Sequence, residues 1–336
     1  MGVDIFFVLS GFLITKILFD SRIKAEKWNV SIFTVIKNFY IRRTLRIFPI
    51  YYLTIFVLLI FHNHTGTNIQ SSFIYFATYT SNFYFFKIQH WDGMISHLWS
   101  LAVEEQFYLF WPWIILFANK KHFLKIVVCF ILIGIISQYT MMKVNLYDIL
   151  TFNCFDAFGL GALLAWQITF RPKNLEKFYR RLSIFAIIAF FIFVLNVIQK
   201  RWEYVPLRTL IAVVSLWVIT YIVLNQENGQ LKLKFIFNNR VLIFLGKISY
   251  GLYLYHLILP SILNKYIFNK YFDAVLPDFL RKNYLWHITL IVDLLILVLA
   301  AWLSFVLIEK RFLRLKKFFE YQDEPGLQNT LIKVPN

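Results

Sequence analysis

The sequence is poor in cysteine and carries no recognisable metal or nucleotide motif. It has 2 cysteines, Cys129 and Cys154, and both lie in apolar stretches, where packed thiols are a simpler interpretation than a disulfide. Its 7 histidines are scattered, and neither a His-Glu-x-x-His motif nor a close pair of cysteines occurs. A phosphate-binding loop and a dinucleotide fingerprint are also missing from the sequence. We therefore expect no metal site and no permanently bound cofactor.

Charged residues are also scarce, and acidic ones are the scarcer kind. Only 16% of the 336 residues are charged, whereas 59% are apolar, which is more than a soluble domain could bury. The formal net charge is +17, but the basic residues cluster between apolar stretches, as in membrane proteins. We therefore predict an all-α, polytopic membrane helix bundle that contacts the lipid bilayer and no nucleic acid.

Nine segments have the roughly 20 mostly apolar residues that a membrane span needs. They are residues 2–19, 47–62, 97–118, 123–140, 147–168, 183–199, 206–225, 241–263 and 286–309. The stretch 69–86, rich in Phe, Tyr, Ser and Thr, is interpreted as a re-entrant or interfacial segment. Residues 1–317 then form one membrane domain, and residues 318–336 form a polar cytoplasmic tail.

The distribution of basic residues predicts the orientation of these spans. Most of the 35 Lys and Arg residues fall in alternate loops, beginning with the loop after the first span. By the positive-inside rule these loops are cytoplasmic, so the N-terminus is predicted outside and the C-terminus inside. A further span at 69–86 would break this alternation.

The segment from His97 to Tyr108 places two adjacent carboxylates, Glu104 and Glu105, inside a predicted span. Each charge near the middle of a bilayer costs about 2.5–3.5 kcal/mol on insertion scales. On a helix, His97, Ser100, Glu104 and Tyr108 share one face, with Glu104 about 10 Å from His97. Glu105 points about 100° away and needs a different partner. Acid–base catalysis, transport and helix packing all stay open for this pair.

A basic cluster, Arg42, Arg43 and Arg46, falls within little more than one helical turn. Arginine forks bind phosphate groups in bidentate fashion, which favours a phosphate-bearing ligand. The alternative is an ordinary positive-inside cluster that contacts lipid headgroups.

Four further polar residues lie in predicted spans. Asp4 is near the outer end of the first span, and Ser10, next to a glycine, permits close helix contact. Asp156 places a single carboxylate in a later span, and His256 lies toward the outer end of the eighth. Helix packing is the alternative interpretation for each of them.

Six segments, taken in order, resemble the acyltransferase family 3 of bacterial integral-membrane acyltransferases. They are residues 2–14, 42–49, 97–108, 155–161, 249–256 and 308–312. The resemblance implies a bundle of about ten spans in the bacterial plasma membrane. It also implies transfer of an acetyl or short acyl group from acyl-CoA, a co-substrate, to a hydroxyl of a surface, lipid-linked or exported glycan.

The resemblance also implies roles for particular residues. Arg42, Arg43 and Arg46 would bind CoA near the cytoplasmic face. Glu104 and Glu105 would line the core, where they orient a histidine or pair with an arginine.

His97 and His256 are alternative bases on the side where a glycan would arrive. Members of the family carry an Arg or Lys, and then a His that serves as the base, in a span before the segment that starts at Gly2. We therefore expect a first helix upstream of Met1. A transporter or flippase with a buried carboxylate proton relay, and an inactive fragment, are the alternatives to an active acyltransferase.

Overall fold

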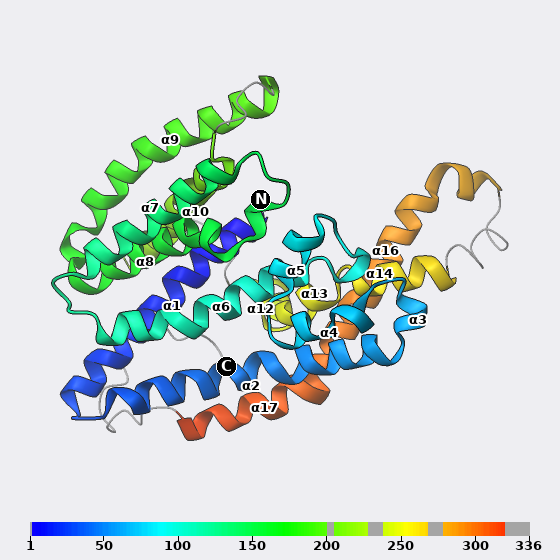
Figure 1. Cartoon of the computed structure of the whole chain (residues 1–336), viewed down its shortest axis with the longest axis horizontal. Helices are drawn as coiled ribbons and strands as arrows, with labels where there is room; N and C mark the ends of the chain where they lie inside the picture. The colour runs from blue at the N-terminus through cyan, green and yellow to red at the C-terminus, as the bar shows by residue number, and fades with distance from the viewer. Residues whose placement is uncertain (1, 200–204, 228–237, 268–277, 320–336) are drawn as a thin grey trace.

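The fold was analysed in a computed structural model that describes residues 2–199, 205–227, 238–267 and 278–319 (Figure 1). In these ranges all regular structure is helical, which confirms the all-α prediction. The long helices are α1 (Gly2–Lys27), α2 (Ile32–Ile60), α6 (Leu98–Phe117), α7 (Phe123–Met141), α8 (Phe155–Phe170), α9 (Leu175–Gln199), α10 (Leu207–Glu227) and α16 (Asp278–Ser304).

Shorter helices connect the long ones. Between α2 and α6 lie α3 (His62–Thr65), α4 (Ile69–Ala77), α5 (Ser81–Ile88) and η1 (Gly93–Ile95). The turns η2 (Tyr147–Ile149) and η3 (Thr151–Cys154) precede α8, and η4 (Pro172–Asn174) follows it. Later come α12 (Arg240–Lys247), α13 (Ser249–Tyr255), α14 (Ile258–Leu263), the π-helix η6 (Phe305–Glu309), α17 (Lys310–Arg314) and η7 (Leu315–Phe319). Most of the predicted polar tail, residues 320–336, lies outside the described residues.

Six helices in the described part of the chain are long and apolar enough to cross a membrane. They are Gly2–Lys27, Ile32–Ile60, Phe123–Met141, Pro172–Ile198, Leu207–Gln226 and Trp286–Phe319, which coincide with six of the nine predicted spans. A seventh predicted span, 97–118, is the unbroken 20-residue helix α6. The run Glu104-Glu105-Gln106 interrupts its apolar character, so it is not among the six.

The prediction of a continuous span was wrong for two segments. Residues 147–168 begin as the short turns η2 and η3, so that α8 has only 16 residues. Residues 241–263 divide into α12, α13 and α14 of 8, 7 and 6 residues. Pro260 contributes to the last break, because it has no N–H to bond the carbonyl of His256.

The segment 69–86 was predicted not to span the membrane, and the structure agrees, because it divides into two short helices. Its two helices α4 and α5 have 9 and 8 residues, which is too short for either to span a bilayer. Between them the backbone of Tyr79 takes a left-handed conformation with φ of 53°. Both short helices pack against longer ones, α4 against α2 and α5 against α6.

Helix α1 lies at the centre of the bundle and contacts α2, α6, α8 and α10 (Figure 1). Glycines allow its backbone to approach α8 very closely. A Cβ atom on Gly161 of α8 would lie 2.0 Å from the carbonyl oxygen of Val8, and one on Gly11 would lie 2.2 Å from that of Phe158. The predicted close contact beside Ser10 is therefore present, and it fixes how α1 sits against its neighbours.

Two buried apolar clusters meet along α2 and α6. One contains Phe7, Trp111 and Phe158, and the other contains Tyr51 and Phe76. On α2, Ile47 belongs to the first cluster and Ile50 to the second. On α6, the boundary lies between Ala102, in the second cluster, and Val103, in the first. Arg46 on α2 and Glu104 and Glu105 on α6 lie within two residues of this boundary.

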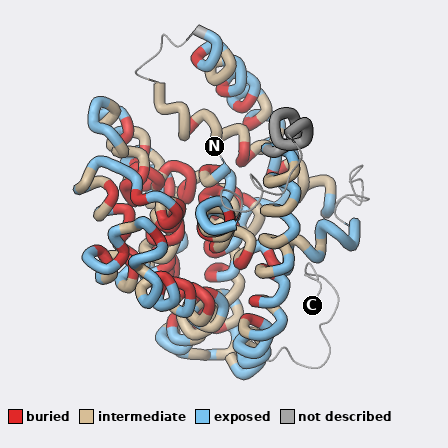
Figure 2. Tube along the Cα trace, turned by 90° about the vertical axis from the view of Figure 1, so that its right-hand side faces the viewer, coloured by how far each residue is buried: buried red, intermediate tan, exposed pale blue. Residues whose placement is uncertain are grey.

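Apolar residues also cover the outside of the bundle, as expected for a surface in contact with lipid. Ile184 and Phe185 on α9 are 61% and 65% exposed, and Leu295 on α16 is 65% exposed. Buried residues concentrate on the inner sides of the helices (Figure 2). A protein in water would not expose so many large apolar side chains, so the structure fits a multi-pass membrane protein.

Candidate active site

Ser10, Glu104 and Tyr108 meet between α1 and α6. The hydroxyl of Ser10 donates to Oε1 of Glu104 at 2.8 Å and lies 3.1 Å from the hydroxyl of Tyr108. One turn further along α6, the indole N–H of Trp111 donates to the hydroxyl of Thr15 at 2.8 Å. These contacts hold the predicted face of α6 against α1 and fix the position of the Glu104 carboxylate.

Arg43 of α2 closes this cluster from the other side. Its guanidinium lies 5.1 Å from the centre of the Tyr108 ring and 5.7 Å from that of Phe39. Arg43 also attracts both carboxylates of α6, Glu104 and Glu105, electrostatically. Arg43 is thus a cation near this pair, while direct pairing of a carboxylate with an arginine stays a prediction.

The three predicted arginines line one cavity of about 120 Å³. Its polar wall comes from α1, α2 and η7 and consists of Ser21, Asn38, Arg42, Arg43, Arg46 and Lys316. Since Arg43 also contacts Tyr108, this basic cavity adjoins the Ser10–Glu104 cluster. Its chemistry suits a phosphate group, because arginine offers several N–H donors at fixed angles.

Glu105 and Gln106 face away from α1, as the helical geometry of α6 predicts. Glu105 lies on the side of α6 that faces Tyr79 and Tyr250, within range of their electrostatic influence. The amide of Gln106 donates to the carbonyl oxygen of Tyr79 at 2.7 Å and to Oδ1 of Asn82 at 2.9 Å. Gln106 thus anchors α6 to the segment around α5, and Glu105 lies in a different environment from Glu104.

His97 and His256, predicted separately, lie side by side with their ring centres 4.7 Å apart. His97 Nε2 is 3.0 Å from the carbonyl oxygen of Leu254, and His256 Nδ1 is 2.6 Å from that of Tyr253. A carbonyl only accepts, so each of these nitrogens carries the proton. The other ring nitrogen of each histidine is then left with a lone pair.

Two hydroxyl residues complete this histidine cluster. Tyr253 donates its hydroxyl to the carbonyl of His97 at 3.0 Å and is also hydrogen-bonded to the hydroxyl of Ser100. Ser100 is one turn from Glu104 on α6. Tyr253 lies in the same motif segment as His256, so the sequence could have indicated it as a candidate. Its contact with Ser100 could not be predicted, because the two residues are 153 positions apart.

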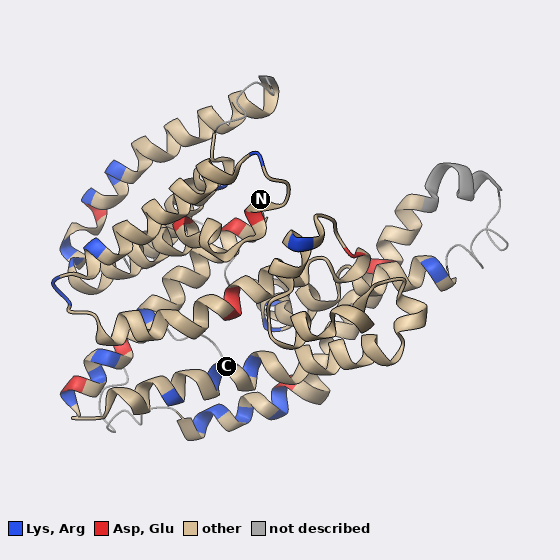
Figure 3. Cartoon of the chain, in the orientation of Figure 1, with Lys and Arg blue, Asp and Glu red and all other residues tan. Residues whose placement is uncertain are grey.

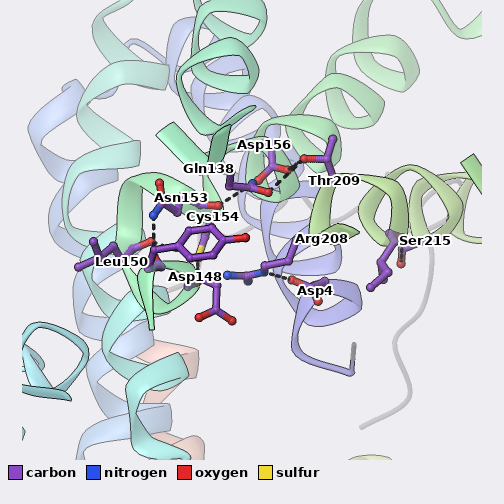
Figure 4. A network of polar contacts seen from close by, with 12 residues as sticks. Asp4, Gln138, Asp148, Leu150, Asn153, Cys154, Asp156, Arg208, Thr209 and Ser215 are labelled. Carbon is purple, nitrogen blue, oxygen red and sulfur yellow. Dashed lines mark hydrogen bonds and ion pairs between the residues drawn. The ribbon is translucent and has the colours of Figure 1, made fainter. Parts of the chain in front are cut away.

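Asp4 and Asp156 belong to a separate network at the junction of α1, α8 and α10 (Figure 4). Arg208 Nε lies 2.6 Å from Oδ1 of Asp4, and the arginine also donates to the carbonyl of Asp148. The hydroxyl of Thr209 donates to Oδ2 of Asp156 at 2.5 Å. Both carboxylates therefore have partners on α10, which supports a packing role for them and separates them from Glu104.

Arg208 lies within the predicted span 206–225, and the structure places it in the first turn of α10. Its charge lies beside the rings of Phe7 and Trp99, with its guanidinium carbon 5.8 Å from each ring centre. Nothing in the local sequence shows that Arg208 would pair with Asp4, which is 204 positions away. Among the described residues, no group of three or more His, Cys, Asp or Glu side chains is placed to hold a metal ion.

Comparison with known proteins agrees with the resemblance carried by the sequence motifs. A family model described as an acyltransferase domain matches residues 1–309. A putative O-acetyltransferase of Staphylococcus aureus (strain COL) is 29% identical over 343 residues, which cover 93% of this chain and 52% of the relative. The peptidoglycan O-acetyltransferase OatA of Listeria monocytogenes is 32% identical over 286 residues, which cover 76% of this chain and 44% of the relative.

A putative peptidoglycan O-acetyltransferase of Bacillus subtilis, YrhL, is 38% identical over 128 residues, or 33% of this chain and 18% of the relative. The chain thus spans about half the length of the first two relatives that it matches. No solved structure matches the chain significantly.

Proposed function

The chain belongs to acyltransferase family 3, and from this membership we propose that it moves an acetyl group from acetyl-CoA to a hydroxyl of an exported cell-wall glycan. The names of its relatives support this proposal, since they are O-acetyltransferases and two of them are named for peptidoglycan. By the charge distribution of the sequence, the basic cavity faces the cytoplasm of a bacterial cell and the histidine cluster faces outward.

The observation that carries the proposal is the series of polar side chains along α6. At one end Arg43, on the wall of the basic cavity, lies against Tyr108. In the middle is Glu104, and at the other end are His97 and His256. Tyr108 and His97 are 11 residues apart, or about 16 Å along the helix axis. A donor and an acceptor that enter from opposite faces could meet within this short distance.

The donor is proposed to enter at the basic cavity. CoA carries phosphate groups, for which Arg42, Arg43 and Arg46 provide charge-assisted donors. With the phosphates held there, the acyl end of the molecule can extend past Arg43 toward the Glu104 cluster. This binding would restrict the thioester to one direction of approach.

The acceptor hydroxyl is proposed to be activated by His256. Its Nδ1 donates to the carbonyl of Tyr253, so the lone pair of Nε2 can accept a proton. As that proton leaves, the hydroxyl oxygen bonds to the thioester carbonyl carbon and the carbon–sulfur bond breaks. The proton passes to the departing sulfur, which gives an O-acetyl ester and CoA.

Glu104 is proposed to hold the reacting groups in the middle of the bundle. Its carboxylate is positioned by the hydroxyl of Ser10 and has the charge of Arg43 nearby. A carboxylate in this place stabilises positive charge that develops on a base during the transfer. It also keeps the Arg43 side chain directed toward the α6 face instead of toward lipid headgroups.

Acetyl transfer in membranes that contain the Glu104→Gln variant tests this proposal. We expect the ester-linked acetate on the glycan to fall at least about 100-fold, the magnitude for loss of one preorganised electrostatic group that stabilises the transition state. Glu176→Gln is the matched control, because Glu176 is exposed on α9 and pairs with Arg180. Normal acetylation by Glu104→Gln, at normal protein levels, would contradict the proposed role.

A further inference from the structure

The arginines of α2 form one part of the basic cavity wall. Another part comes from the C-terminal end of the described residues. Lys316 of η7 lines it opposite Arg42 and Arg46, although 270 or more residues separate them in sequence. Both α17 and η7 contact α2 along their length. In Figure 3, Lys and Arg positions, coloured blue, recur along the ribbons of α2 and α17 where these helices run side by side.

We infer that the segment Lys310–Phe319 is part of the donor site, and that Lys316 binds a phosphate group of acyl-CoA together with the arginines of α2. This inference rests on the proposed function and adds a residue and a segment to it.

The size and charge of the cavity support a single phosphate group as its occupant. A volume of about 120 Å³ is well below the roughly 300–1,000 Å³ of pockets that hold a whole organic ligand. Four of its nine lining residues are Lys or Arg, and none of the nine is Asp or Glu. A compact anion with several acceptor oxygens fits these walls, whereas the rest of the donor would lie outside the cavity.

The neighbouring lysine provides a comparison within the same turn. Lys317 is exposed, and its ammonium lies 5.0 Å from the centre of the Phe318 ring on the surface. Lys316 is half-buried and faces the cavity. Two adjacent lysines of equal charge therefore differ in whether they can reach a ligand held by the arginines.

A phospholipid headgroup shares the chemistry of a donor phosphate. The donor is favoured because Arg43 belongs both to the cavity wall and to the Tyr108–Glu104 cluster. A bound phosphate in the cavity would thus be directly beside the residues that are proposed to handle the acyl group. A site that binds only a lipid headgroup would not require Arg43 to link the cavity to the Tyr108–Glu104 cluster.

The test is acetyl-CoA binding and turnover by the full chain in nanodiscs, with phosphatidylcholine alone or with added phosphatidylglycerol. We expect Lys316→Ala to raise the Kd and the KM for acetyl-CoA about tenfold in both lipids, with little change in kcat. Lys316→Arg should restore binding, and Lys317→Ala should behave as the wild type.

Equal behaviour of Lys316→Ala and Lys317→Ala would overturn the inference. An effect of Lys316→Ala that occurs only with phosphatidylglycerol would also overturn it, since it would assign the cavity to a lipid headgroup. Arg42→Ala separates this outcome from failure of the proposed function. If Arg42→Ala weakens acetyl-CoA binding and Lys316→Ala does not, only the inference fails; if neither does, the proposed donor site fails as well.

Discussion

Substitution of Gly161 by alanine tests whether the close approach of α1 and α8 supports the candidate site. An alanine Cβ would lie 2.0 Å from the carbonyl oxygen of Val8, whereas ordinary contacts begin at 3.4 Å. The helices would have to separate by about 1.4 Å at this point, because the obstacle is backbone and cannot rotate away. Overpacking of this kind costs about 1–3 kcal/mol, and we expect the upper end here.

The assay is thermal unfolding of the purified protein in detergent, together with acetyl transfer in membranes. We expect Gly161→Ala to lower Tm by at least about 5 °C and to lower acetyl transfer, because a shift of α1 also moves Ser10 relative to Glu104. Gly246→Ala is the matched control, since a Cβ there meets no atom within 4 Å and alanine favours a helix by about 0.5–1 kcal/mol. A Gly161→Ala protein as stable and active as the Gly246→Ala protein would refute this reasoning.

Three further substitutions test separate contacts. Asp4→Asn removes the carboxylate beside Arg208 and should lower stability by about 3–5 kcal/mol in thermal unfolding; an unchanged Tm would contradict a buried ion pair. Arg22→Ala removes hydrogen bonds of 2.8 and 2.7 Å to the last carbonyls of α6, which should speed amide exchange there; unchanged exchange would argue against this cap. Ser10→Ala should lower kcat about tenfold through Glu104; a rise in KM alone would contradict that role.

Long apolar runs made most of the bundle predictable from sequence. The predicted spans 2–19, 123–140 and 206–225 correspond to α1, α7 and α10. The bounds were less accurate where a basic stretch continues the same helix. Helix α2 begins at Ile32 instead of near residue 47, and its basic first half continues through Pro49 into the apolar second half without a break.

The broken segments could not be predicted from hydrophobicity. Residues 147–168 are apolar enough for a span, but polar side chains there make contacts that stabilise turns instead. Asn153 donates to the carbonyl of Tyr147 at 2.6 Å, and Gln138 of α7 donates to the carbonyl of Asn153 at 2.8 Å. The bond from Gln138 depends on the packing of the neighbouring helix α7, which hydrophobicity does not predict.

In the candidate site, too, the sequence predicts local features, whereas contacts between distant residues could not be predicted. The shared face of Glu104 and Tyr108 follows from helical periodicity alone, and Ser10 was found from its motif. The contact between His97 and His256, and the approach of Lys316 to the arginines, depend on how distant helices pack. A single sequence shows which residues are unusual in a membrane span, but it does not show which of these residues contact one another.

An acetyl group is proposed to pass between opposite faces of the membrane along α6, from the basic cavity to the histidine cluster. Proteoliposomes with the protein inserted in one orientation test this claim most directly, with radiolabelled acetyl-CoA and a peptidoglycan oligosaccharide added to chosen sides. We expect labelled ester only when acetyl-CoA is on the side of Arg42 and the oligosaccharide is on the side of His256. Equal labelling with both on one side, or with their sides exchanged, would contradict the claim.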